Sequence, residues 1–296
     1  MAEEARRTTS RRELSATAGF DQVSPVVGAL DPDAFDDLLD EDADAALGLL
    51  AAMAGATDEG LRELARRLAG RVLVDVARVG VAASRGIGRM SIQPARRAVG
   101  DIDLDASADA ITSARAARRP PHIDDLSVAA WRRPSTALCL LVDRSGSMHG
   151  ERLAAAAIAA ASVAYRAGDD CSIVVFGEDA VVIEAQDERR PVDEVVSDLL
   201  RLRGHGTTDV GLALRVAARQ LDRSRAGRKV AVLLSDCRVT TGGDPVADAA
   251  RLVELAIIAP ADDLADARSL AAAVGARCVG LSGPSGVPAA VAEALS

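Results

Sequence analysis

Three separate segments of the sequence carry oxygen-bearing side chains of the kind that bind hard metal ions. The segments are 143–148 (DRSGSM), 206–209 (GTTD) and 235–236 (SD). Together they supply two carboxylates and three hydroxyls, from Asp143, Asp236, Ser145, Ser147 and Thr208. None of the three segments contains a histidine or a cysteine. The donor set therefore consists of oxygen atoms.

Hard divalent cations prefer such donors. Mg²⁺ favours octahedral oxygen coordination, keeps some water ligands and seldom has a complete protein cage. Ser145 and Ser147 are two residues apart, so both hydroxyls can face the same side of an extended turn, and Gly146 between them lets the backbone approach an ion. Because hydroxyls are neutral, an ion held this way keeps enough positive charge to bind one more carboxylate from a partner.

Apolar runs and helical periodicity show which elements must position these segments. Strands are predicted at 137–142, 171–176, 180–183 (an edge strand), 230–234, 255–259 and 277–281. Helices are predicted at 151–166, 192–202, 209–221, shortly after 245, at 264–274 and from 287. This alternation on short connections predicts an α/β fold with a doubly wound, mostly parallel sheet. In such a sheet functional groups gather beyond the carboxyl ends of the strands, where the three segments lie.

The part of the chain before this sheet has a different pattern. Residues 1–30 are polar and predict a flexible tail, and 31–119 predict a mainly helical region in which 91–104 is ambiguous. Eight acidic residues between 31 and 44 are interpreted as the solvated face of an amphipathic helix. Residues 120–135 are rich in proline and polar groups and predict a linker, and 136–296 form the α/β domain.

The segment 143–147 fits the pattern D-x-S-x-S directly after a buried strand, and a threonine loop and a strand-terminal aspartate follow it. This combination resembles the metal-ion-dependent adhesion site (MIDAS) of von Willebrand factor A (VWA) domains, over about residues 136–282. The resemblance implies that Asp143, Ser145, Ser147 and Thr208 hold Mg²⁺ or Mn²⁺, with Asp236 acting directly or through water. Thr208 is favoured over Thr207 because 208–214 (TDVGLAL) resembles the family's T-D-hydrophobic-x-x-A-L run. Thr207 and Cys237 stand where glycine is common in that family.

A helical region ahead of a C-terminal VWA domain resembles the arrangement in the bacterial CoxE-like proteins, which accompany MoxR-type AAA+ ATPases. The resemblance implies a non-catalytic adaptor, a co-chaperone-like partner of such an ATPase in assembly of, or metal insertion into, a client protein. The ATPase or its client would contribute an acidic residue to the metal.

Two other functions are compatible with the same residues. A Mg²⁺-dependent phosphatase or phosphotransferase could use Asp143 as its nucleophile, but enzymes of that kind place a second acid at the position of Ser145. Alternatively, the N-terminal helices bind the partner and the metal site is only structural. A serine hydrolase is disfavoured because neither Ser145 nor Ser147 lies in a G-x-S-x-G motif.

Composition excludes further classes. The 296 residues carry a net charge of −9, which argues against a general nucleic-acid binder. Lys229 is the only lysine, so the chain has no phosphate-binding loop of the GxxxxGK[ST] type. The four cysteines form no C-x-x-C pair, the first residues contain no apolar signal segment, and no uncharged run reaches the length of a membrane span. These features predict a cytoplasmic protein without a membrane span.

Overall fold

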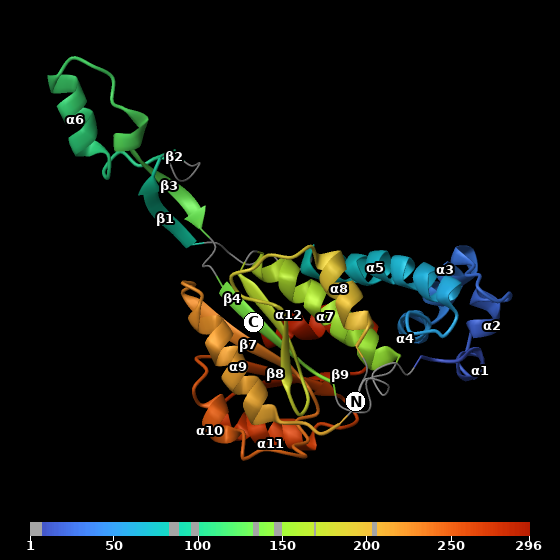
Figure 1. Cartoon of the computed structure of the whole chain (residues 1–296). Helices are drawn as coiled ribbons and strands as arrows, with labels where there is room; N and C mark the ends of the chain where they lie inside the picture. The colour runs from blue at the N-terminus through green and yellow to red at the C-terminus, as the bar shows by residue number, and fades with distance from the viewer. Residues whose placement is uncertain are drawn as a thin grey trace. The chain divides into compact units, whose positions relative to one another are not determined.

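The computed structural model describes residues 8–82, 89–95, 101–132, 136–144, 150–168, 170–202 and 206–296. The chain forms two compact units (Figure 1), one made from Met1–Ser84 together with Thr136–Ser296 and the other from Arg85–Ser135. Each unit is described by itself.

A six-stranded sheet with the order β6-β5-β4-β7-β8-β9 lies at the centre of the larger unit. Its strands are β4 (Thr136–Asp143), β5 (Cys171–Phe176), β6 (Ala180–Glu184), β7 (Arg228–Leu234), β8 (Leu255–Pro260) and β9 (Arg277–Leu281). All neighbouring strands are parallel except β6, which pairs antiparallel with β5 at the edge. The structure confirms the predicted doubly wound, mostly parallel sheet. The strands could be located because the central ones are buried on both faces and therefore read as continuous apolar runs.

Alternate residues of the strands enter two separate hydrophobic clusters, one on each face of the sheet. One face is covered by α7 (Glu151–Ala167), α8 (Val192–Leu200) and α12 (Val287–Ala294). The other is covered by α9 (Val210–Asp222), α10 (Val246–Ala249) and α11 (Ala265–Val274). The sheet is therefore the middle layer of a three-layer α/β unit, and its carboxyl edge is left to the loops.

Helix α7 has no polar face along most of its length, because residues 153–163 are all buried. Its outer side is covered by α4 (Ala43–Met53) and α5 (Glu59–Ala82), so these N-terminal helices add a further layer outside α7. The approach of α4 is close: a Cβ placed on Gly48 would lie 2.7 Å from the Cγ of Glu151. Glycine at this position lets the first turn of α7 pack against α4.

The N-terminal residues are more ordered than the sequence predicted. Short helices α1 (Arg11–Leu14) and α2 (Phe20–Val23) lie in the described part of the expected flexible tail. Their residues Leu14, Phe20 and Val23 are buried in the same cluster as α4 and α5. The few large apolar side chains of this polar segment therefore suffice to anchor it.

The acidic run 31–44 divides into α3 (Pro32–Glu41) and the start of α4. Asp31 caps α3, accepting hydrogen bonds from the amides of Asp33 and Ala34, and Pro32 occupies the first turn. Phe35 and Leu38 are the buried residues of α3, which agrees with the amphipathic interpretation.

The described residues of the smaller unit form a three-stranded antiparallel sheet and one α-helix. The sheet order is β1-β3-β2, with β1 (Arg89–Pro94), β2 (Asp101–Ile102) and β3 (Ser127–Arg132), and the helix is α6 (Ala108–Ala116). A short 3₁₀ turn, η2 (Ile123–Asp125), precedes β3. The sequence predicted a linker where β3 lies and left the segment containing β1 ambiguous. The pairing of β1 with β3 joins residues more than 30 positions apart, which local periodicity does not reveal.

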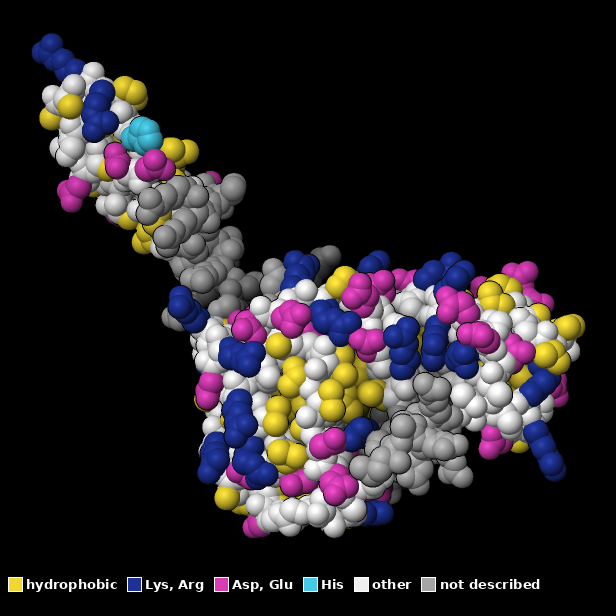
Figure 2. All heavy atoms as spheres, in the orientation of Figure 1, with side chains coloured by type: hydrophobic (Ala, Val, Ile, Leu, Met, Phe, Trp, Pro, Cys, Tyr) yellow, Lys and Arg dark blue, Asp and Glu magenta, His cyan; other side chains and the backbone are white. Residues whose placement is uncertain are grey.

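Acidic and basic side chains are interspersed over the face seen in Figure 2, and the described part of that face has no single large basic area. Among the helices of the described residues, none combines the length and the apolar character that crossing a bilayer requires.

Candidate functional site

Asp143 is the last residue of β4 and is 5% exposed, so its carboxylate is held at the carboxyl edge of the sheet rather than in solvent. Its Oδ2 accepts a hydrogen bond of 2.6 Å from the hydroxyl of Ser235, the first residue after β7. The Ser235 hydroxyl in turn accepts the amide of Cys237 at 2.9 Å. Two of the three segments singled out in the sequence therefore meet. Ser145 and Ser147 lie outside the described residues.

Thr208 is 3% exposed and is fixed by its backbone. Its amide donates to the Oγ1 of Thr240 at 2.7 Å, and its carbonyl accepts the amides of Thr240 at 3.1 Å and Thr241 at 3.3 Å. Thr240 belongs to the loop that follows Asp236. The second and third segments are thus also joined.

Asp209 connects the threonine loop to β5. Its side chain caps α9 by accepting the amide of Leu212 at 2.8 Å, and its own amide donates to the carbonyl of Gly177 at 2.9 Å. Immediately before Gly177, the carbonyl of Phe176 accepts the amide of Arg144 at 2.8 Å, and the Arg144 guanidinium forms an ion pair with Asp179.

These hydrogen bonds form a closed ring at the carboxyl edge of the sheet. The ring runs from the end of β4 to the loop after β5, then to the threonine loop, to the loop after β7, and back to Asp143 through Ser235. We call this arrangement the loop ring. Because every loop is tied to two others, the side chains that it carries are held in fixed relative positions.

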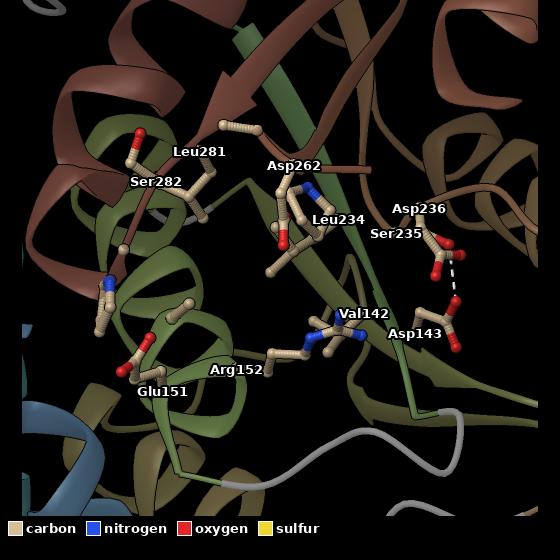
Figure 3. A pocket seen from close by; sticks show the side chains of 15 residues that line it. Val142, Asp143, Glu151, Arg152, Leu234, Ser235, Asp236, Asp262, Leu281 and Ser282 are labelled. Atoms are coloured by element: carbon tan, nitrogen blue, oxygen red, sulfur yellow. Dashed lines mark hydrogen bonds between the residues drawn. The ribbon is translucent and has the colours of Figure 1, made fainter. Parts of the chain in front are cut away.

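Asp236 is partly buried, and its Oδ1 accepts the amide of Arg238 at 2.9 Å in a tight local turn. Asp143, Ser235 and Asp236 lie together on one side of a cavity of about 490 Å³ (Figure 3). We call it the edge cavity. It lies between α7, the ends of β4, β7, β8 and β9, and the short η3 turn (Pro284–Gly286).

Cys237 has a left-handed backbone conformation, with φ of +61°, which is uncommon for a residue with a side chain. Glycine is common at this position in the VWA domains that the sequence resembles. The observed φ explains that preference, because glycine adopts it without strain. Burial raises the pKa of the Cys237 thiol above its usual range, and the nearby carboxylate of Asp236 acts in the same direction. The thiol is 4% exposed and packs in the hydrophobic cluster on the α9 face of the sheet.

The donor set at the edge fits a hard cation better than a soft one. Within the described ranges, no three His, Cys, Asp or Glu side chains come together in a way that could hold a metal ion. An ion between Asp143 and Asp236 would therefore need hydroxyl oxygens in addition, and the buried Thr208 lies on the loop ring that joins these two residues. Carboxylates with hydroxyls and water are ligands that suit Mg²⁺ and Mn²⁺.

The sequence does not identify two residues of the loop ring as functional candidates. Ser235 stands beside Asp236 in the sequence and supports Asp143, and no motif marks Thr240. A hydroxyl directly after a buried strand is a signal that could have identified Ser235. The hydrogen bond of Thr240 depends on how its loop folds back over 32 residues to Thr208, which spacing alone does not show.

Comparison with known proteins assigns the fold. Residues 138–238 match the family model of the von Willebrand factor type A domain, and the sheet with its two helical layers is a VWA, Rossmann-like fold preceded by a helical region. The VWA match covers both aspartates and the threonine loop. No curated protein matches the chain.

Solved structures with a similar arrangement have low sequence identity. A von Willebrand factor type A protein from Catenulispora acidiphila is 19% identical, with a TM-score of 0.40 over 56% of this chain and 43% of that one. An aerotolerance-related membrane protein from Bacteroides fragilis is 16% identical, with a TM-score of 0.43 over 54% of this chain and 98% of that one. Proximal thread matrix protein 1 from the mussel byssus is 14% identical, with a TM-score of 0.43 over 54% of this chain and 47% of that one.

Another structure of the mussel protein is described as having a zinc-occupied MIDAS motif. The present chain spans less than half the length of the mussel and Catenulispora proteins.

Proposed function

We propose that the VWA domain is a non-catalytic protein-interaction module that depends on a divalent cation, Mg²⁺ or Mn²⁺. The proposed ligands are Asp143, Ser145, Ser147, Thr208 and Asp236, the last directly or through water. When bound, the ion supplies a positive charge that accepts an acidic side chain from a partner. The protein's own residues hold the site in shape and leave one side open to that partner.

The loop ring is the observation that carries the proposal. It ties the loops bearing Asp143, Thr208 and Asp236 to one another by hydrogen bonds of 2.6–3.3 Å. A set of ligands from distant segments binds an ion well only if the cost of bringing them together is met during folding rather than at binding. The ring provides such preorganisation.

The open side supports an adaptor rather than an enclosed catalytic centre. Asp236 is only partly buried and lines the edge cavity. A partner carboxylate can therefore reach an ion held beside it.

We propose a MoxR-type AAA+ ATPase or its client as the partner, and the cytoplasm as the compartment. The helical region ahead of the VWA domain, as in CoxE-like proteins, supports the choice of partner. All four cysteines are free thiols, which is what a reducing compartment favours.

Direct metal titration of the full chain tests the metal site. We expect Mg²⁺ and Mn²⁺ to bind by isothermal calorimetry, and Asp143→Ala to lower the affinity by more than about 100-fold, because even changes to groups that only orient ligands cost 10–100-fold. Since Asp143 is buried, Asp236→Ala serves as a second variant in a more exposed position. Asp193→Ala, on the exposed first turn of α8, is the matched control.

Affinity purification from the native host, with and without a chelator, tests the interaction. We expect an AAA+ ATPase or its client to be retained by the wild type with Mg²⁺ and lost with the chelator or in Asp236→Ala. Equal recovery of the same partner under all these conditions would remove the metal from the mechanism.

A further inference from the structure

The lining of the edge cavity is partly apolar and partly charged. Its apolar residues include Val142, Leu234, Leu281 and Pro284, from three strands and η3. Its charged residues supply four carboxylates and one guanidinium, from Asp143, Asp236, Asp262, Glu151 and Arg152. Figure 3 shows Asp143 and Asp236 together on one side, Glu151 on the other, and Arg152 between them.

The lining is acidic even with a cation in the proposed site. Its five charged side chains sum to −3, and one divalent cation would bring the total to −1. Asp262 and Glu151 are exposed side chains, so they are accessible to a partner. An apolar lining beside exposed carboxylates fits a side chain with an aliphatic stem and a cationic head.

The walls of the cavity are braced by the N-terminal helical layer. Asp44 of α4 accepts the amide of Ser285 in η3 at 2.7 Å. One turn further along α4, Gly48 packs against Glu151 at the start of α7. Both walls are therefore held from outside, so the cavity is formed before any partner binds, which reduces the entropic cost of binding.

We propose that the edge cavity receives a lysine or arginine side chain of the protein partner, from a residue near the acid that binds the metal. This inference rests on the proposed function and adds a specificity element to it. The stem of the basic side chain contacts the apolar part of the lining, and its head pairs with the exposed carboxylate of Asp262. The recognised motif is thus an acidic residue with a basic residue close by in sequence.

Peptide binding to the Mg²⁺-loaded full chain tests the inference. The probes are peptides of equal length with one fixed glutamate. At each of the four positions after this glutamate in turn, the peptides carry lysine, glutamine, leucine or glutamate. We expect lysine at one of these positions to bind about tenfold more tightly than glutamine, the gain of about one charge-assisted contact. Leucine binding as well as lysine would overturn the proposal in favour of an apolar occupant.

A charge reversal identifies the pairing residue. In Asp262→Lys we expect the preference for lysine to change to one for glutamate at the same peptide position, whereas Asp193→Lys keeps the wild-type preference. Because Asp262 is exposed, the variant is expected to fold, which circular dichroism checks. An unchanged lysine preference in Asp262→Lys would contradict the pairing.

The same titrations separate this inference from the proposed function. Binding that a chelator abolishes but that does not depend on the varied residue would refute the basic-side-chain pocket and leave the metal-dependent module standing. A lysine preference that persists with the chelator would refute the metal dependence and leave the pocket standing. No binding by any peptide, with Mg²⁺ or without it, would overturn both.

Discussion

Replacing Ser235 by alanine removes one hydroxyl that serves two buried groups. The hydroxyl donates to the Asp143 carboxylate at 2.6 Å and accepts the Cys237 amide at 2.9 Å. All three residues are buried, so water cannot easily take over either interaction. The substitution leaves the chain fold and the apolar core unchanged, because serine and alanine differ only by this oxygen.

The expected loss follows from the two interactions. A hydrogen bond to a charged group contributes about 1.5–3 kcal/mol, and a buried amide left without an acceptor costs about 1–3 kcal/mol. Since neighbouring terms do not add fully, we expect the free energy of unfolding to fall by about 3 kcal/mol. For a unit of this size that corresponds to a decrease in Tm of about 6–12 °C.

Thermal and urea unfolding of the full chain, followed by circular dichroism without added metal, measure this loss. Ser282→Ala is the matched control, because Ser282 also lines the edge cavity but is exposed, and we expect it to stay within about 0.5 kcal/mol of the wild type. If Ser235→Ala lowered the free energy of unfolding by less than about 1 kcal/mol, the hydroxyl would not be holding the two loops together.

Substitutions at three further positions test other features of the structure. Burial raises the pKa of Glu184, so the folded protein is less stable once this carboxyl group ionises as pH rises. Glutamine stays neutral, so Glu184→Gln should raise the urea midpoint at pH 8 more than at pH 4. Cys237 has a φ of +61°, which glycine adopts easily and β-branched valine does not. Cys237→Gly should therefore keep the free energy of unfolding within about 1 kcal/mol of the wild type, whereas Cys237→Val should lower it by about 2 kcal/mol or more. Thr240→Val removes the acceptor of the Thr208 amide and should lower both stability, by about 1–2 kcal/mol, and Mg²⁺ affinity in calorimetry.

Each of these three predictions has an outcome that would contradict it. An equal gain at both pH values would mean that Glu184→Gln acts through packing rather than through ionisation. Valine tolerated at position 237 would show that the left-handed conformation is not required there. For position 240, Thr240→Ser keeps the hydroxyl and is the control, and a serine variant as weak as the valine variant would exclude the hydrogen bond as the cause.

The central sheet could be predicted because its two middle strands, β4 and β7, give continuous apolar runs that end at a polar residue. The run 137–142 ends at Asp143, and 230–234 ends at Ser235, so the sequence also located the edge where the candidate site lies. These are local signals, because burial on both faces favours apolar residues along the whole strand.

The smaller unit could not be predicted in the same way. Met90 and Ile92 of β1 alternate with polar residues as in a strand, but both are mostly exposed, and their partners in β3 lie far along the chain. A short strand of this kind is stabilised by its pairing rather than by its own composition. The order of the N-terminal segment likewise depends on the surface that α4 and α5 offer to Leu14 and Phe20.

For the candidate site, the sequence predicts the two aspartates at the ends of strands but not the residues that support them. The positions of Asp143 and Asp236 follow from the ends of strands. The hydroxyls of Ser235 and Thr240 act through loop conformations, including the left-handed residue at 237, that no periodicity encodes.

The burial of α7 on every side has a consequence for how this chain can vary. A helix that has only alanine, aliphatic residues and one serine over 153–163 is tolerable only while α4 and α5 shield it. A shortened chain that begins at β4 would expose this hydrophobic surface of α7 to water and should aggregate. In any descendant that loses the leading helices, the outward positions of α7 must first become hydrophilic, so the two parts of the larger unit are constrained to evolve together.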